Sequence, residues 1–318
     1  MSERRAAGIV AGGLLALALA DPANASVLTV RPVAELGNPA PGTGDSFVAF
    51  GTPVINDAGR VAFEGAIPNS GRIWRETPAG LEQVAAWGDV PTGAPGGASL
   101  QAFCELLFSN GGHVVVRAEL DDGAEGYFSA APGGAAAIAV EGQVAPGTTD
   151  IFQRIDSSPR ISDAGDIAFY GVLDTFSGPT GIWMGGAGTL SLLARQGDPA
   201  PGGSGDPFFI LSDFPRICAA GDVGFASLLF GAAARAGLWK GAPGNLADEL
   251  VAPMSDYRHA FLSDDEEWVF VDQSASVTPR IRAGVPGDFP PSTRWAIRRR
   301  GSQRAWASRA FPTGPTCA

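Results

Sequence analysis

Acidic residues recur beside regularly spaced glycines, where carboxylates could bind Ca²⁺. Four residues belong to this set: Asp57, Asp163, Asp166 and Asp222. A calcium ion takes about six to eight oxygen ligands, and one loop usually supplies several of the acids. Each loop here offers only one or two acids, whereas Asp in a turn readily accepts hydrogen bonds from nearby backbone amides. We therefore expect these residues to stabilise turns, and the sequence leaves any metal site unknown.

Two further arrangements of acids could carry chemistry. The run Asp264-Asp265-Glu266-Glu267 is a candidate cation site, but runs of like charge usually mark a solvated surface, and we expect a solvated turn. Hydrolysis of a glycosidic bond needs two carboxylates a few ångströms apart in a pocket. Isolated acids are present, and no spacing pairs any two of them: Glu64, Glu119, Asp174 and Asp206. No catalytic residue is assigned from them.

Other catalytic and cofactor motifs are missing from the sequence. The two histidines, His113 and His259, stand far apart and support no Ser-His-Asp triad, and no Gly-x-Ser-x-Gly motif occurs. Glycine-rich strings such as Gly93-Ala-Pro-Gly-Gly97 lack the Gly-Lys-Ser/Thr element of a phosphate-binding loop, so we expect them to be linkers. We expect Cys104 and Cys218 to be small buried residues. The sequence therefore predicts no cofactor and leaves enzymatic activity open, with a non-catalytic role favoured.

The elements that carry these residues repeat along the chain. The first copy reads Pro53-Val-Ile-Asn-Asp-Ala-Gly59-Arg-Val-Ala-Phe63, and the third runs from Pro159 to Phe169 in nearly the same residues. A looser copy runs from Pro215 to Phe225, and the most degraded one from Leu107 to Val116. The marker glycines are spaced by 53, 53 and 56 residues: Gly59, Gly112, Gly165 and Gly221. A fixed period of this length indicates an array of one supersecondary unit.

Each unit has further landmarks that predict its strands. An aromatic dipeptide such as Ile182-Trp183 follows each marker glycine, and we expect its large side chain to fill the space between units. A Gly/Pro element such as Gly142-Gln-Val-Ala-Pro146-Gly147 comes next, and we expect it to break strand pairing and lead to the next unit. Short alternating apolar runs between turn residues predict four antiparallel strands per unit. The fold class is therefore all-β, a β-propeller-like array of four-stranded antiparallel blades with about four to five units of 50–56 residues. A β-solenoid ranks second, because its coils are usually shorter.

The ends of the chain differ from the repeats. Arg4 and Arg5 precede an apolar run, and Ala23-Asn24-Ala25 is a small-x-small cleavage site, so residues 1–25 are predicted to be a signal peptide. Residues 26–273 form the predicted repeat domain. Residues 274–318 are arginine-rich and aperiodic, which predicts a tail that is disordered or translated out of the repeat's reading frame. No second apolar run is long enough to span a membrane, so none is expected after cleavage.

The charge distribution bears on partners and location. The chain carries a net charge of −11, although its last 44 residues hold eight arginines against one acid. An acidic body argues against nucleic-acid binding, which requires Lys and Arg to displace phosphate counterions. Together with the predicted signal peptide, the charge suits a secreted, periplasmic or cell-surface protein.

The string Asn56-x-x-Gly59-x-x-Ala62-Phe63 resembles the bacterial exported tandem-repeat family that is named for its Asn-x-x-Gly-x-x-Ala-Phe motif. The resemblance covers roughly residues 27–272. It weakens at Ser162 and Cys218, which replace the Asn of the motif. It implies a secreted or surface-held, propeller-like repeat protein with no assigned activity, and it offers no catalytic residues to transfer. Members often end in a sorting anchor, and this chain shows no apolar anchor helix at its end.

These observations predict an exported non-catalytic repeat protein, a binding or scaffold module of the cell envelope or exterior. Its ligand is an unknown extracellular glycan or protein. The alternative is a propeller-type glycoside hydrolase or lyase that acts on extracellular polysaccharide, and a third reading is a degraded relic without present function. A cluster of acids converging on the central channel would favour the enzyme.

Overall fold

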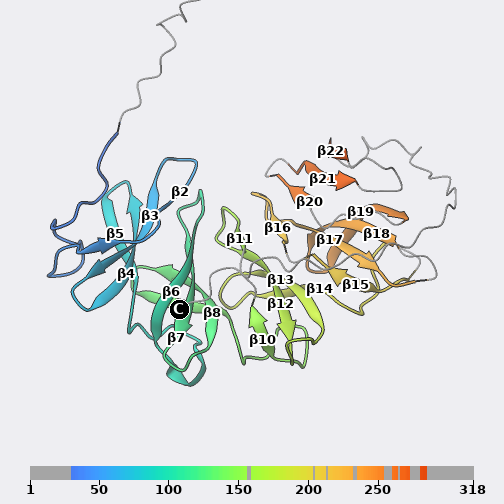
Figure 1. The fold of residues 1–318 in the computed structure, drawn as a ribbon, viewed down its shortest axis with the longest axis horizontal. Helices are drawn as coiled ribbons and strands as arrows, with labels where there is room; N and C mark the ends of the chain where they lie inside the picture. The colour runs from blue at the N-terminus through green and yellow to red at the C-terminus, as the bar shows by residue number, and fades with distance from the viewer. Residues whose placement is uncertain are drawn as a thin grey trace, which may run out of the picture. The chain divides into compact units, whose positions relative to one another are not determined.

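The computed structural model shows an all-β chain built from five antiparallel sheets (Figure 1). It contains no α-helix in its described part, and its one 3₁₀ turn is η2 (Pro95–Gly97). The all-β prediction is therefore confirmed. The described residues are 30–155, 159–202, 205–212, 214–231, 235–253, 260–263, 266–272 and 280–284.

The first two sheets follow one another in the chain. In the first sheet the strand order is β1-β3-β4-β5, with β2 also paired to β3. Its strands are β1 (Ala49–Phe50), β2 (Val54–Ile55), β3 (Val61–Ile67), β4 (Ser70–Thr77) and β5 (Gly80–Ala86). The second sheet has the order β6-β7-β8-β9. Its strands are β6 (Leu100–Phe108), β7 (Val114–Leu120), β8 (Glu125–Ala131) and β9 (Gly134–Val140).

The third and fourth sheets repeat the arrangement of the first sheet, in which two short strands pair with the same long strand. The fifth sheet has three described strands. The third sheet contains β10 (Phe152–Ile155), β11 (Arg160–Ile161), β12 (Ile167–Leu173), β13 (Thr180–Gly185) and β14 (Ser191–Arg195). The fourth contains β15 (Phe208–Leu211), β16 (Arg216–Ile217), β17 (Val223–Leu229), β18 (Arg235–Ala242) and β19 (Asn245–Pro253). The fifth contains β20 (Ala260–Leu262), β21 (Trp268–Asp272) and β22 (Arg280–Gly284).

The repeated motif forms the hairpin that enters the second long strand of each unit. Gly59 has φ 71°, and its N–H donates to the carbonyl of Asn56 at 2.9 Å. A residue with a Cβ rarely adopts such a φ, which explains the glycine. The same positive φ and the same bond recur at Gly112, Gly165 and Gly221. The predicted hairpin is thus confirmed in all four copies.

The Asn of the motif connects neighbouring sheets. The buried Asn56 accepts a hydrogen bond from the Arg60 N–H at 3.0 Å, and its Nδ2 donates to the Ser109 carbonyl of the next hairpin at 3.0 Å. In the third unit the shorter Ser162 keeps only the bond within its own hairpin, to the Asp166 N–H. The motif residue therefore fixes the spacing of consecutive hairpins where it is Asn.

Aromatic side chains fill the interfaces between consecutive sheets. Phe169 stacks on Trp183 with ring centroids 6.1 Å apart, and both pack with Tyr127 of the second sheet. Phe225 and Trp239 pack in the same way against the third sheet. Phe63 and Trp74 form an equivalent stack in the first sheet, at 6.1 Å. The three Phe residues thus make the same stack on a tryptophan, and in the third and fourth units this stack also packs on the preceding sheet.

The sheets pack in chain order, from the first to the fifth. Among the described strands no closed ring is detected, so closure of a propeller is not part of the observed fold. The contacts divide the chain into Met1–Val33 and Ala34–Ala318, and all the strands lie in the second unit. The predicted signal peptide lies outside the described residues, as does 285–318. Strand β22 lies beyond residue 273, so strand pairing extends into the segment predicted as tail.

Candidate functional site

Among the acids of the hairpin loops, Asp57 has a structural partner, whereas Asp222 lies half-buried in the fourth hairpin. The Asp57 N–H donates to Asn110 Oδ1 and Asn110 Nδ2 donates to Asp57 Oδ2, both at 2.9 Å, which links the first two hairpins. Asp163 is exposed and Asp166 half-buried, in the third hairpin. In the ranges that the structure describes, no three His, Cys, Asp or Glu residues are arranged to hold a metal ion.

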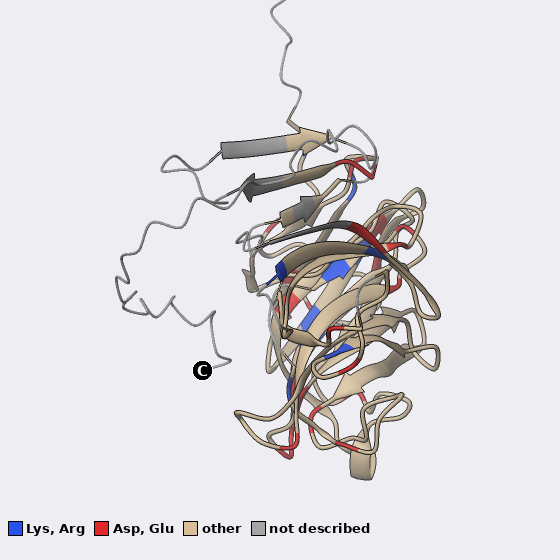
Figure 2. Ribbon diagram, turned by 90° about the vertical axis from the view of Figure 1, so that its right-hand side faces the viewer, with Lys and Arg blue, Asp and Glu red and all other residues tan. Residues whose placement is uncertain are grey.

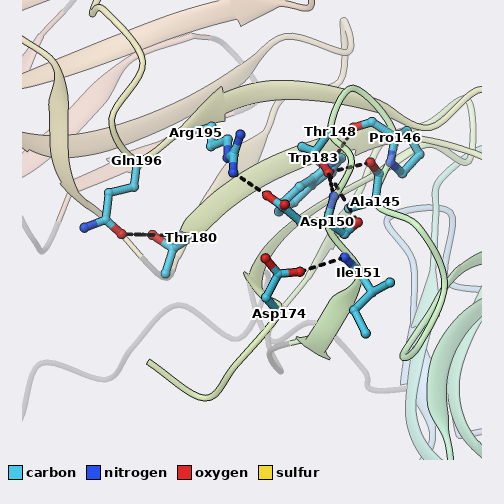
Figure 3. Close-up of polar contacts among 10 residues, drawn as sticks. All are labelled: Ala145, Pro146, Thr148, Asp150, Ile151, Asp174, Thr180, Trp183, Arg195 and Gln196. Carbon is cyan, nitrogen blue, oxygen red and sulfur yellow. Dashed lines mark hydrogen bonds and ion pairs between the residues drawn. The ribbon is translucent and has the colours of Figure 1, made fainter. Parts of the chain in front are cut away.

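The remaining candidate acids are not brought together. Asp206 forms an ion pair with Arg235, and Asp174 accepts a hydrogen bond from the Ile151 N–H at 3.2 Å (Figure 3). Glu119 lies on β7, and Glu64 lies half-buried on β3, where burial raises its pKa. These separate positions agree with the sequence, in which no spacing pairs any two of these acids.

The acidic run and the histidines have other roles. Glu266 forms an ion pair with Lys240. The hydrogen bond between the two side chains is the largest cause of the raised pKa of Lys240. Asp264 and Asp265 lie outside the described residues, and so does His259. His113 packs against Gly165 of the next hairpin, where an added Cβ would lie 2.8 Å from the imidazole Cγ. The His113 imidazole therefore sets the distance between the second and third hairpin loops.

The cysteines correct one expectation. Cys218 is buried and free, as predicted. Cys104 is half-buried and takes part in a disulfide, so it is not the free core residue that was expected.

The Gly/Pro elements are ordered caps rather than simple linkers. In the third unit the indole Nε1 of Trp183 donates to the Pro146 carbonyl at 3.0 Å (Figure 3). Trp74 makes the same bond to Pro41 at 3.0 Å, and Trp239 to Pro201 at 3.4 Å. Each element therefore folds back over the tryptophan of the sheet that follows it. This bond satisfies the one polar group of a buried indole.

Short-range bonds hold each cap in shape. In the third unit the Ala145 N–H donates to the Asp150 carbonyl at 2.8 Å, and the Thr148 hydroxyl donates to the Ala145 carbonyl at 2.9 Å. The Asp150 carboxylate pairs with Arg195 at the end of β14 (Figure 3). The Ala145 and Thr148 bonds lie within the element, and the Asp150 ion pair fastens the element to β14, so these groups support packing.

A cluster of charges that the sequence did not reveal lies between the second and third sheets. Arg117 on β7 pairs with Glu125 on β8, and Glu141 accepts a hydrogen bond from the Ile155 N–H of β10 at 3.2 Å. Burial raises the pKa of Glu141, the charge of Glu125 adds to that rise, and the Arg117 guanidinium opposes it. A carboxyl group whose pKa is raised by burial is one of the features that general acid catalysis uses.

We expect Glu141→Gln to change the pH dependence of stability. Because the pKa of Glu141 is raised, the folded protein holds this proton more tightly than the unfolded chain does. The free energy of unfolding of the wild type therefore falls as pH rises from about 4.3, the ordinary pKa of Glu, through the higher pKa of the folded state. Urea titrations should show both proteins equally stable below about pH 4 and the variant more stable near pH 7, by less than about 1 kcal/mol because solvent screens the site. A variant less stable at neutral pH would contradict the assignment.

A second charged feature lies on the strands that join consecutive sheets. These joining strands are β2, β6, β11, β16 and β20, each of which contacts the next. On the first four of these strands, the position two residues before the hairpin Asn, Ser or Cys holds Val54, Leu107, Arg160 and Arg216 in turn. Val54 and Leu107 pack partly buried against the core. Arginine replaces these aliphatic side chains in the third and fourth units.

The two arginines act on one another. Burial, and then the charge of Arg160, lowers the pKa of Arg216 to about 10. The third and fourth units therefore bring two guanidinium groups close to one another on neighbouring joining strands. Figure 2 shows Lys and Arg largely within the strands, whereas much of the Asp and Glu lies in connecting loops. The signal was visible in the sequence as the change from Val54 to Arg160 and Arg216 within aligned repeats.

Comparisons with known proteins find weak structural similarities and one family. No curated protein matches the chain. A prolyl endopeptidase structure matches at 13% identity and a TM-score of 0.44, covering 74% of this chain and 34% of that one. A puromycin hydrolase mutant complexed with PGG matches at 13% identity and 0.32, covering 70% and 36%. PorZ, a surface component of the type-IX secretion system of Porphyromonas gingivalis, matches at 15% and 0.33, covering 78% and 36%. The chain thus spans about a third of the length of these proteins.

The part of the chain that the structure describes contains no helix long and apolar enough to cross a membrane. A family model matches residues 19–126 and again residues 109–278, which together cover most of the chain. The chain therefore belongs to the DUF7453 family, a family of unknown function.

Proposed function

We propose that this protein is an exported, non-catalytic binding module of the cell envelope or exterior, and that Arg160 and Arg216 bind an anionic group of its ligand. The observation that carries the proposal is the arginine pair on two neighbouring joining strands. A guanidinium group binds a carboxylate through two parallel hydrogen bonds, which gives both affinity and orientation.

The surroundings favour a carboxylated polysaccharide. Phe214 lies two residues before Arg216 and is 41% exposed. Aromatic rings offer flat apolar faces on which sugar rings can pack. A uronic-acid polymer combines such rings with regularly spaced carboxylates. Binding of an acidic polymer to an acidic protein also requires a localised positive site, as the arginine pair provides.

Calorimetric titration with oligogalacturonate tests the proposal, with neutral dextran oligomers for comparison. Loss of one charge-assisted contact costs about 1.5–3 kcal/mol, so Arg160→Gln and Arg216→Gln should each weaken binding roughly 10- to 100-fold. Arg60→Gln is the matched control, because it removes the same charge from the first hairpin. Equal affinity for dextran, or an equal loss in the control, would refute the arginine site.

The alternative function, a glycoside hydrolase or lyase, is favoured by Glu125 and Glu141. These acids lie in one charge cluster, and the pKa of Glu141 is raised. Release of reducing ends or unsaturated uronates from the same polymer would identify this activity, provided that Glu141→Gln abolishes it. Binding without product release would leave the binding module as the better description.

A further inference from the structure

The first sheet exposes an apolar face that is covered in the units after it. Ile55, next to Asn56 on β2, is 68% exposed. The residues at the same position in the second, fourth and fifth sheets are Phe108, Ile217 and Leu262, which are 9%, 6% and 7% exposed. Each of these three packs in a core cluster with the sheet before it. We call this side of a sheet its leading face.

A second residue on the leading face of the first sheet behaves in the same way. Phe50 pairs with Gly65 and is 39% exposed. Its equivalents Ile155 and Leu211 are 1% and 3% exposed, because they pack against the preceding sheet. Two core positions of the repeat are therefore uncovered together in the first sheet.

On the fifth sheet, one described residue of the opposite side is exposed. Val269 on β21 is 37% exposed, whereas its equivalents Ala62, Val115 and Ala168 are each 0% exposed. Those residues lie on the trailing face, the side that packs on the next sheet. The chain thus carries one uncovered leading face and one uncovered trailing face among its described sheets.

We propose that the trailing face of the fifth sheet in one copy of the chain packs on the leading face of the first sheet in a second copy. The interfaces between consecutive sheets within the chain join a trailing face to a leading face, so the two uncovered faces are of matching kinds. Both are exposed in the same chain, so they do not cover one another there. The contact is head-to-tail, and it either closes into a ring of copies or continues as a chain of copies.

Complementary variants test this contact. Light scattering coupled to gel filtration should show concentration-dependent association of the full chain. Ile55→Glu and Val269→Glu each place a charge in the contact and should weaken association at least about tenfold, since burying an unpaired charge is costly. Val144→Glu is the control, because Val144 is 61% exposed in the third unit's Gly/Pro element.

Mixing the variants separates a head-to-tail contact from other contacts. The Ile55→Glu protein keeps an intact trailing face, and the Val269→Glu protein keeps an intact leading face. An equal mixture should therefore form a heterodimer that grows no further. A monomeric wild type at every concentration tested would overturn the proposal, and so would association that Ile55→Glu reduces no more than Val144→Glu does.

Discussion

Trp183→Ala is expected to lower the free energy of unfolding by about 3–5 kcal/mol, the usual range when a large aromatic side chain is removed from a packed interior. Trp183 is 0% exposed and stacks on Phe169, and Phe152 meets its ring edge-on with centroids 4.9 Å apart. Its loss leaves a cavity between the second and third sheets and a Pro146 carbonyl without its indole donor. Urea denaturation followed by circular dichroism measures the change as a shift in midpoint at constant slope.

Two controls separate the causes of this loss. Trp183→Phe keeps most of the apolar burial and removes the N–H, so it should cost about 1–3 kcal/mol. Trp87 is 42% exposed, and Trp87→Ala should cost less than half as much as Trp183→Ala. If removal of Trp183 cost no more than removal of Trp87, the sheets would not be stacked through this tryptophan.

The strands could be predicted from the sequence because their causes are local. Val61, Phe63 and Gly65 alternate with residues of the other face, and this period of two is a direct property of extended backbone. The marker glycines predict hairpins because few other residues tolerate a positive φ. A period of fifty-odd residues then requires similar units to bury similar side chains.

The caps and the charge cluster around Glu141 could not be predicted in this way. Gly and Pro break strands, so Pro146 and Gly147 suggested a linker, whereas the cap depends on an indole 37 residues further along the chain. The raised pKa of Glu141 depends on Arg117 and Glu125 from other strands and on a backbone amide of the third sheet. Local rules describe neither, because both depend on how separate strands meet.

Gly147→Val is expected to lower the free energy of unfolding by about 3 kcal/mol. Gly147 has φ 80°, a conformation that costs a residue with a Cβ about 1–2 kcal/mol and a β-branched residue more. A Cβ at this position would also lie 2.9 Å from the Cβ of Leu192 on β14, and overpacking of this kind adds about 1–3 kcal/mol. Urea denaturation of the variant measures the sum of both effects.

Gly142→Val isolates the steric part of this effect. Gly142 belongs to the same Gly/Pro element and has the same φ of 80°, but a Cβ added there would meet no atom within 4 Å. The difference between the two valine variants therefore measures the contact between the cap and Leu192. In a double-mutant cycle, Leu192→Gly should reduce the cost of Gly147→Val, because the nearest opposing atom is the Cβ of Leu192. Equal losses in both valine variants would mean that the cap rests loosely on β14, and the Gly/Pro elements would then act as the linkers that their composition suggests.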